Sequence, residues 1–139
     1  MFNRRGFLSG AVYATIATID LASSQSRADT QEPSAYPLKI LNKTEYPGDK
    51  YACILVKLDL APGQLVPRHM HPGVESSYIA LGSITLSVKD QPDLIVKAGD
   101  GYQIPPETPH TVRNGADKST IIATFIVEKD KPLVEPVPE

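Results

Sequence analysis

The 139-residue sequence has a single cysteine, no tryptophan and only three histidines. One cysteine cannot pair within the chain, so an intramolecular disulfide and a cysteine-rich zinc site are excluded. Cys53 lies in the apolar run YACILVKL, a context that favours a small buried side chain over a reactive thiol.

Long apolar runs and an excess of basic residues are also absent. No stretch of about 18 apolar residues without a charge occurs, so no segment is expected to span a membrane permanently. The formal net charge of −2 argues against a protein that binds nucleic acid, because that role needs a basic surface. The apolar and charged fractions, 41% and 22%, are typical of a globular chain, and the length fits one domain.

The first 28 residues have the layout of an export signal. Arg4 and Arg5 precede a mildly apolar stretch at 10–19, and the run Ser26-Arg27-Ala28 supplies small residues at the two positions that a signal peptidase reads. We therefore expect cleavage after residue 28 and a mature chain that begins at Asp29. The alternative is an N-terminal helix that packs on the domain.

The run Asn3-Arg4-Arg5-Gly6-Phe7-Leu8 resembles a twin-arginine signal, the type that carries folded proteins out of the bacterial cytoplasm. The weak apolar stretch and Arg27 just before the cut favour this route over general secretion. Asn3 and Ser9 depart from the commonest residues of such signals. The expected location is periplasmic or secreted.

The remaining chain divides by composition. Residues 29–37 are polar and contain prolines, as linkers do, and the acidic, proline-rich residues 130–139 are expected to trail along the surface or to be disordered. Residues 38–129 are left for the folded domain. No internal repeat is evident in them.

The domain is predicted to be all-β. Several short segments are rich in Val, Ile, Leu, Thr and Tyr and are separated by Gly, Pro, Asn and Asp, a pattern typical of a sandwich or barrel. No segment has a sustained helical period. The expected strands are 38–42, 51–60, 76–81, 84–89, 94–97, 110–113 and 119–128.

The segment 119–128 is apolar at both odd and even positions, so we expect both of its faces to be covered. One face would line the interior. The other would pack on a partner subunit or on the 38–42 strand.

The three histidines and one glutamate form the candidate site. His69 and His71 are two residues apart and would share one face of a strand, while Glu75 could return after the Pro72-Gly73 turn to face them. His110 is the only other histidine. Imidazoles with a carboxylate suit one divalent transition metal. The alternative is that the histidines are ordinary polar core residues.

The spacing around these residues resembles the two motifs of the cupin superfamily. The first runs Gly63, five residues, His69, one residue, His71, three residues, Glu75, six residues, Gly82, and the second is given by Gly99, Pro105, His110 and Asn114. The resemblance implies a single-domain double-stranded β-helix (jelly-roll) barrel. It also implies that His69, His71, Glu75 and His110 are the metal ligands, and that the protein forms a homodimer.

Glu107 is the one departure from the second motif, where the family usually has glycine. We expect a slightly remodelled turn with the carboxylate in solvent. The alternative places that carboxylate at the mouth of the pocket. Gly63, Gly82 and Gly99 are expected to serve turns, and Asn114 to cap a strand end.

The resemblance implies a small-molecule oxidoreductase, dioxygenase-like, in which Glu75 acts as a ligand or as a catalytic base. The alternatives are a cupin isomerase or lyase, and a non-catalytic periplasmic module that binds or senses a metal or small ligand. Mn or Fe is the favoured metal, with Ni, Zn and Cu as alternatives. The candidate pocket residues are Tyr78, Tyr102, Gln103, Ile104 and Phe125.

Overall fold

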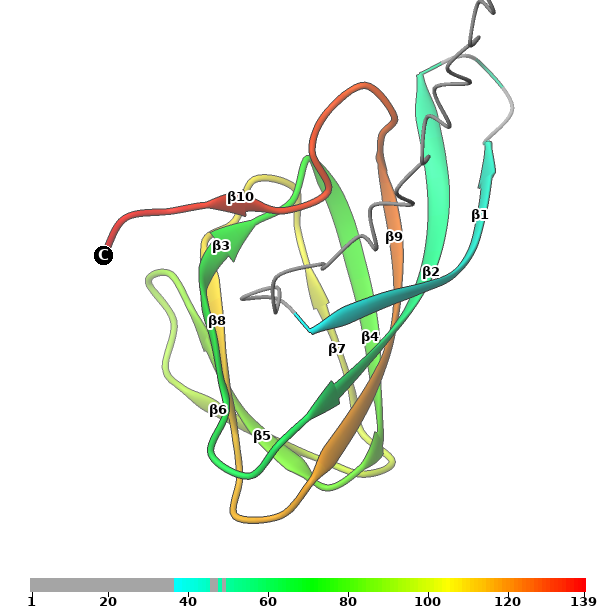
Figure 1. Ribbon diagram of the computed structural model, residues 1–139. Coiled ribbons are helices and arrows are strands. Elements are labelled where there is room, and N and C mark those ends of the chain that lie inside the picture. The colour runs from blue at the N-terminus through cyan, green and yellow to red at the C-terminus, as the bar shows by residue number, and fades with distance from the viewer. Residues whose placement is uncertain (1–36, 46–47, 49) are drawn as a thin grey trace, which may run out of the picture. The chain divides into compact units, whose positions relative to one another are not determined.

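The computed structural model describes residues 37–45, 48 and 50–139 (Figure 1). The expected export signal at 1–28 and residues 29–36 of the expected linker lie outside the described residues. The described residues form ten strands and no helix, so none of them forms a helix that could cross a membrane. The strands are β1 (Leu38–Glu45), β2 (Tyr51–Leu60), β3 (Leu65–Met70), β4 (Gly73–Leu81), β5 (Ser83–Val88), β6 (Leu94–Lys97), β7 (Gly101–Ile104), β8 (His110–Asn114), β9 (Ser119–Glu128) and β10 (Glu135–Pro136).

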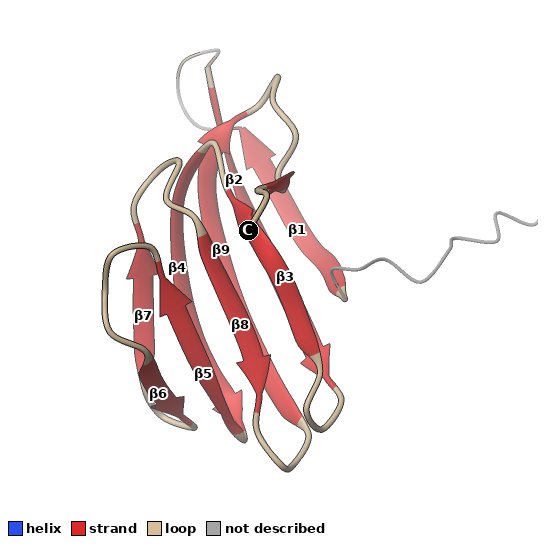
Figure 2. Cartoon of the chain, turned by 90° about the vertical axis from the view of Figure 1, so that its left-hand side faces the viewer, coloured by secondary structure: helices blue, strands red, loops and turns tan. Residues whose placement is uncertain are grey.

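The strands form two antiparallel sheets of five that face each other (Figure 2). One sheet has the order β1-β2-β9-β4-β7, and the other has the order β10-β3-β8-β5-β6. Strands that are neighbours in sequence, such as β3 and β4, lie in different sheets, which is the jelly-roll connection. The predicted all-β double-sheet fold is confirmed.

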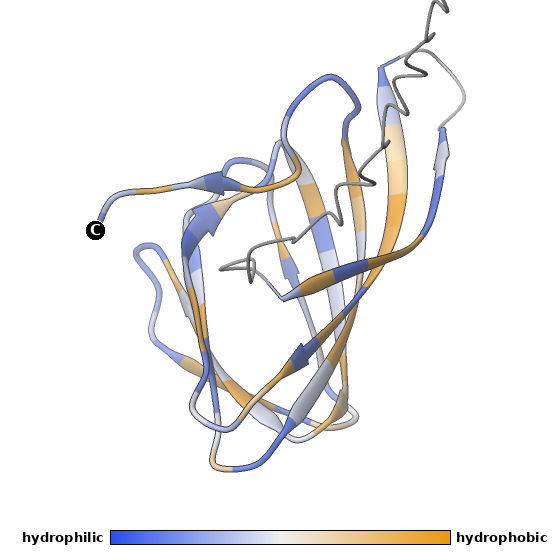
Figure 3. Cartoon of the chain, in the orientation of Figure 1, coloured by the Kyte–Doolittle hydropathy of each residue, from blue (hydrophilic) through white to orange (hydrophobic). Residues whose placement is uncertain are grey.

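The core fills the space between the sheets, because alternate residues of each strand point inward. Burial alternates along β9, where Ile121, Ala123, Phe125 and Val127 are almost inaccessible to solvent. Apolar residues are concentrated on the strands, and the turns are mostly hydrophilic (Figure 3). One buried cluster draws on both sheets: Leu60, Val66, Ile79, Ile84, Leu86, Val96, Ile104, Val112 and Ile121.

For the outer face of β9, one of the two expected covers, the 38–42 segment, is wrong, and the other, a partner subunit, stays a prediction. Ile122 is half-buried and Ile126 is 43% exposed, so this face is not fully covered by the chain. The 38–42 segment does not cover it, because β1 pairs edge to edge with β2 in the same sheet. Cys53 is likewise half-buried instead of lying in the core.

Besides β3, which was expected only as the strand that carries His69 and without bounds, two strands were not expected from the sequence. β7 lies within a run of turn residues and pairs with β4, where its extended backbone completes the sheet. β10 belongs to the C-terminal segment, Asp130–Glu139, which does not simply trail over the surface but pairs with the end of β3. The prolines and charges of this segment gave no indication of the pairing.

Candidate metal centre

A β-bulge in β3 aims His69 at the interior. In the β3–β8 pair, Val66 lies opposite Val112 and His69 lies opposite His110. Two residues separate the paired positions on β3 but only one separates them on β8, so β3 carries one extra residue. Without the extra residue, Arg68 would take the inward position that follows Val66. The bulge places His69 there and opposite His110.

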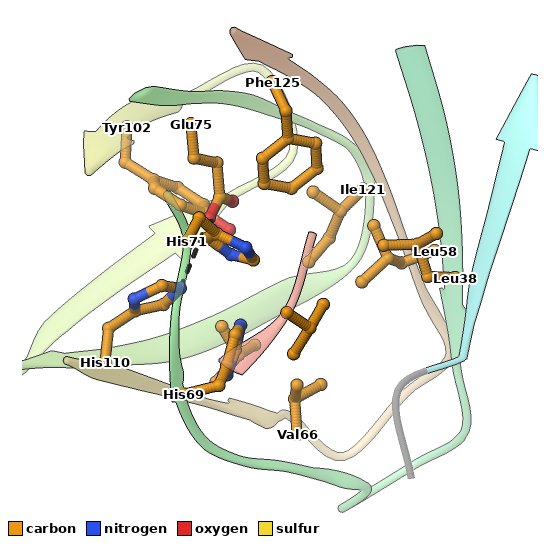
Figure 4. A pocket seen from close by; sticks show the side chains of 12 residues that line it. Leu38, Leu58, Val66, His69, His71, Glu75, Tyr102, His110, Ile121 and Phe125 are labelled. Atoms are coloured by element: carbon orange, nitrogen blue, oxygen red, sulfur yellow. Dashed lines mark ion pairs between the residues drawn. The ribbon is translucent and has the colours of Figure 1, made fainter. Parts of the chain in front are cut away.

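The three histidines lie together at one end of the barrel and are almost fully buried (Figure 4). His69 comes from β3, His71 follows directly after β3, and His110 is the first residue of β8. One ligand nitrogen from each lies within 4.8 Å of the others, close enough to hold one metal ion. Sequence spacing predicted that these three side chains would meet.

Each imidazole is oriented by a backbone carbonyl. The Nδ1 atoms of His69, His71 and His110 lie 2.7, 2.6 and 2.9 Å from the carbonyl oxygens of Pro67, Leu133 and Thr108. A carbonyl oxygen only accepts hydrogen bonds, so each Nδ1 carries the proton. In the neutral ring, Nε2 then keeps its lone pair, which is the arrangement seen in histidines that bind metals.

Glu75 lies beside the histidines and is also buried. Its Oε2 atom is 3.2 Å from His71 Nε2 and 3.3 Å from His110 Nε2 (Figure 4). Its Oε1 atom accepts a 2.6 Å hydrogen bond from the Ser77 hydroxyl. Ser77 is two residues further along β4 and therefore on the same face.

The local electrostatics keep Glu75 charged and His69 neutral. Burial raises the pKa of Glu75, but the hydrogen bonds that His110 and His71 donate when Nε2 also carries a proton outweigh it and hold the pKa well below its usual range. Burial lowers the pKa of His69 to about 4, and His110 adds to this effect. Burial and the Glu75 charge raise the pKa of Tyr102 well above its usual range, so Tyr102 remains a neutral hydroxyl.

These residues fit a divalent metal. His71 Nε2 is buried and has no hydrogen-bond partner in the described part of the chain. With Nδ1 protonated, the Nε2 lone pair and the Glu75 carboxylate are both electron donors that face each other at 3.2 Å. Burying two electron-rich atoms that face each other costs free energy unless a cation lies between them. His69, His71 and His110 are thus placed to hold a metal, and Glu75 Oε2 lies beside two of them, His71 and His110.

A pocket reaches this cluster and has mostly apolar walls (Figure 4). Of the candidate pocket residues, Tyr102 and Phe125 line it, and the Phe125 ring lies 4.6 Å from that of His71. Ile104 is in the buried core cluster, and Tyr78 and Gln103 are exposed. The sequence did not single out the remaining apolar wall residues, which are Leu38, Leu58, Val66, Val112, Ile121 and Val134.

Glu107 has a backbone conformation that glycine adopts more easily than other residues. Its φ is +54°, in the left-handed region that side chains seldom adopt, and its N–H donates a 2.9 Å hydrogen bond to the carbonyl of His71. The carboxylate is exposed, with the Lys131 ammonium at 3.9 Å. Glu107 is not among the residues that line the histidine pocket.

Two facing antiparallel sheets with a histidine cluster at one end define a double-stranded β-helix with a metal-binding constellation. Residues 56–127, more than half of the chain, match the cupin domain, and the chain belongs to the cupin family.

Several solved structures share the fold at low sequence identity. A cupin-like protein from Thermotoga maritima is 22% identical with a TM-score of 0.58, over 73% of this chain and 75% of that one. The DMSP lyase DddQ from Ruegeria pomeroyi is 21% identical with a TM-score of 0.61, over 83% and 59%. An oxalate oxidase is 23% identical with a TM-score of 0.54, over 62% and 46%, so this chain spans less than half of it. Because two of these proteins are named for different reactions, an oxidase and a lyase, the shared fold does not specify the reaction.

Proposed function

We propose that this cupin is a metal-dependent, dioxygenase-like oxidoreductase that acts on a small and largely apolar molecule. The observation that carries the proposal is the pocket with apolar walls that ends at the histidine cluster. A storage or structural metal site is enclosed by its ligands, whereas a catalytic site needs access for a further molecule. The pocket that ends at the histidines supports such access; its free volume of about 20 Å³ in this structure is enough for a water-sized molecule, so a larger substrate requires the walls to open.

The proposed roles follow from the contacts described above. His69, His71 and His110 bind the metal as neutral imidazoles, and Glu75 binds it or removes a proton from the substrate. A metal of this kind, when bound, supplies Lewis-acid or redox chemistry. Ser77 holds one oxygen of Glu75 by its 2.6 Å hydrogen bond, which leaves the other oxygen directed at the histidines.

The pocket lining supports a substrate class. No lysine or arginine lines the pocket within the described part of the chain, and Tyr102 supplies the one hydroxyl. A small dianion would therefore find no side-chain cation, and only the metal could neutralise it. A molecule with metal-binding oxygens and an apolar body, such as an enol, a catechol or a 1,3-diketone, matches the polar end and the apolar walls in chemical character.

The test combines elemental analysis with oxygen uptake. Protein purified from its native compartment is analysed for metal and then incubated with a panel of enols, catechols and 1,3-diketones. We expect one Mn or Fe per chain and oxygen consumption that is lost in His69→Ala and retained in the exposed-site control Gln103→Ala.

Each other outcome contradicts the proposal in a distinct way. Conversion of a panel compound without oxygen uptake would identify an isomerase or a lyase. Full metal occupancy with binding but no conversion would identify a non-catalytic binding module.

We also propose that the protein is exported to the periplasm by its twin-arginine-like signal and forms a homodimer. The apolar outer face of β4 and β9 supports the homodimer, because Val74, Tyr78 and Ile126 are 38%, 51% and 43% exposed.

A further inference from the structure

The C-terminal segment, Asp130–Glu139, contacts the metal centre directly. The Leu133 carbonyl accepts the 2.6 Å hydrogen bond from His71 Nδ1, across 62 residues of sequence. The next residue, Val134, lines the pocket. One short stretch of backbone thus orients a metal ligand and forms part of the pocket wall.

Contacts on both sides of Leu133 fix the position of its carbonyl. On one side, the Lys131 N–H donates to the Glu128 carbonyl at 3.3 Å, and the Leu133 side chain packs against the buried cluster of β2 and β9. On the other side, β10 pairs with Met70 and His69, and the Val137 N–H donates to the Arg68 carbonyl at 3.1 Å. The segment therefore holds the carbonyl at a defined place relative to β3.

His71 differs in this respect from the other two histidines. His69 and His110 donate to the carbonyls of Pro67 and Thr108, each two residues earlier in the chain. Their orientation is therefore supplied locally by β3 and by the turn before β8. The orientation of His71 depends on the segment that follows β9.

We propose that the C-terminal segment is a positioning strap for the metal centre, which fixes the tautomer and ring orientation of His71 through the Leu133 carbonyl. This inference rests on the proposed metal centre and adds a determinant of metal retention that lies outside the cupin motifs. The hydrogen bond keeps the proton on Nδ1 and so keeps the Nε2 lone pair directed at the metal. Without it, the ring can rotate or exchange tautomers, and part of the population cannot bind.

The test measures the three histidines separately. A chain ending at Lys129 is compared with the intact chain and with a control ending at Val137, which keeps β10 and the Val137 N–H. Side-chain ¹⁵N NMR on the metal-free proteins reports each tautomer. We expect the His71 ring to lose its fixed Nδ1 proton in the shorter chain, while His69 and His110 serve as internal controls and keep theirs.

Zinc affinity, measured by competition with a chelator, is the second readout. We expect the chain ending at Lys129 to bind zinc roughly 10–100-fold more weakly, the range for loss of a hydrogen bond to a metal ligand. The control ending at Val137 should bind as the intact chain does. Failure of the intact chain to bind zinc would contradict the metal centre, whereas the NMR comparison would still test the strap.

A second variant covers the case in which the truncated chain does not fold. Val137→Pro keeps the full length and the Leu133 carbonyl but removes the N–H that donates to Arg68. We expect weaker zinc binding and loss of the fixed tautomer at His71 alone. Unchanged zinc affinity with an unchanged His71 tautomer, or equal loosening of all three histidines, would overturn the proposal.

Discussion

Three buried imidazoles each have Nδ1 on a backbone carbonyl and lie close enough together to hold one ion, and the Glu75 carboxylate lies beside the Nε2 atoms of two of them, His71 and His110. The carbonyls decide which nitrogen carries the proton, so the cluster is organised for a cation before any cation arrives. Asn114, the last residue of the second motif, has a structural role instead. Its Nδ2 donates to the carbonyls of Leu60 and Ala61 at 3.1 and 2.6 Å and thereby ties the end of β8 to the end of β2.

At the residue scale we predict that His69→Ala, His71→Ala and His110→Ala each weaken metal binding by more than the roughly 10–100-fold that loss of an outer hydrogen bond costs. Each change removes one coordinate bond and leaves the other buried donors without full compensation. Metal content after dialysis against a chelator is the measurement. One equivalent of metal retained by the triple variant would show that the ion is bound elsewhere.

At the element scale, the approach of β4 to β9 sets the turn between His71 and Glu75. Gly73 begins β4 and pairs with Val127 of β9. A Cβ atom at Gly73 would overlap the Ile126 carbonyl oxygen and lie 2.6 Å from the Val127 Cα. Both contacts are with backbone, so rotation of a side chain cannot relieve them, and β4 would have to move away from β9.

We therefore predict that Gly73→Ala lowers the free energy of unfolding by about 1–3 kcal/mol, the usual cost of overpacking, and weakens zinc binding as Glu75 shifts. The matched control is Gly63→Ala. Gly63 has a φ of +68°, but no atom lies within 4 Å of the place that a Cβ would take. We expect Gly63→Ala to lower the free energy of unfolding by about 1–2 kcal/mol through backbone strain alone. Zinc affinity should stay unchanged. Urea unfolding and chelator competition measure the two effects. Native zinc affinity in Gly73→Ala would argue that the close approach does not position the ligands.

At the scale of the whole molecule, export in the folded state would decide which metal the protein carries. Imidazole-rich sites bind Cu and Zn more tightly than Mn and Fe. A chain that folds in the cytoplasm, where free Cu and Zn are scarce, would take up Mn or Fe and carry it out inside the barrel. A chain that folds after export would take whichever ion binds most tightly there.

We predict that the protein exported by its own signal contains Mn or Fe, and that rerouting residues 29–139 through an unfolded-chain pathway replaces that ion with Zn or Cu. Mass spectrometry of the purified protein from the same cells and medium measures the difference. In the control, Arg4→Lys together with Arg5→Lys should leave the precursor in the cytoplasm, because the export receptor reads the arginine pair as an address. The same ion by both routes would remove the link between export and metal choice.

The sequence alone determined the all-β fold and the positions of most strands. β2, β6 and β9 have the predicted bounds, because apolar β-branched runs between turn residues leave few other structures open to the chain. The motif spacing predicted that His69, His71 and His110 would lie together, although His71 lies just after β3 and not on it.

Tertiary structure decided how those side chains are aimed and what surrounds them. The bulge at Pro67 and Arg68 decides which residues of β3 point into the barrel. It forms only when β3 pairs with β8. The pocket walls come from strands of both sheets and from the C-terminal segment, so no local spacing identifies them. The bond from His71 to Leu133 joins residues 62 apart. Patterns in sequence report local periodicity, whereas contacts between distant segments arise only when the sheets pack against each other.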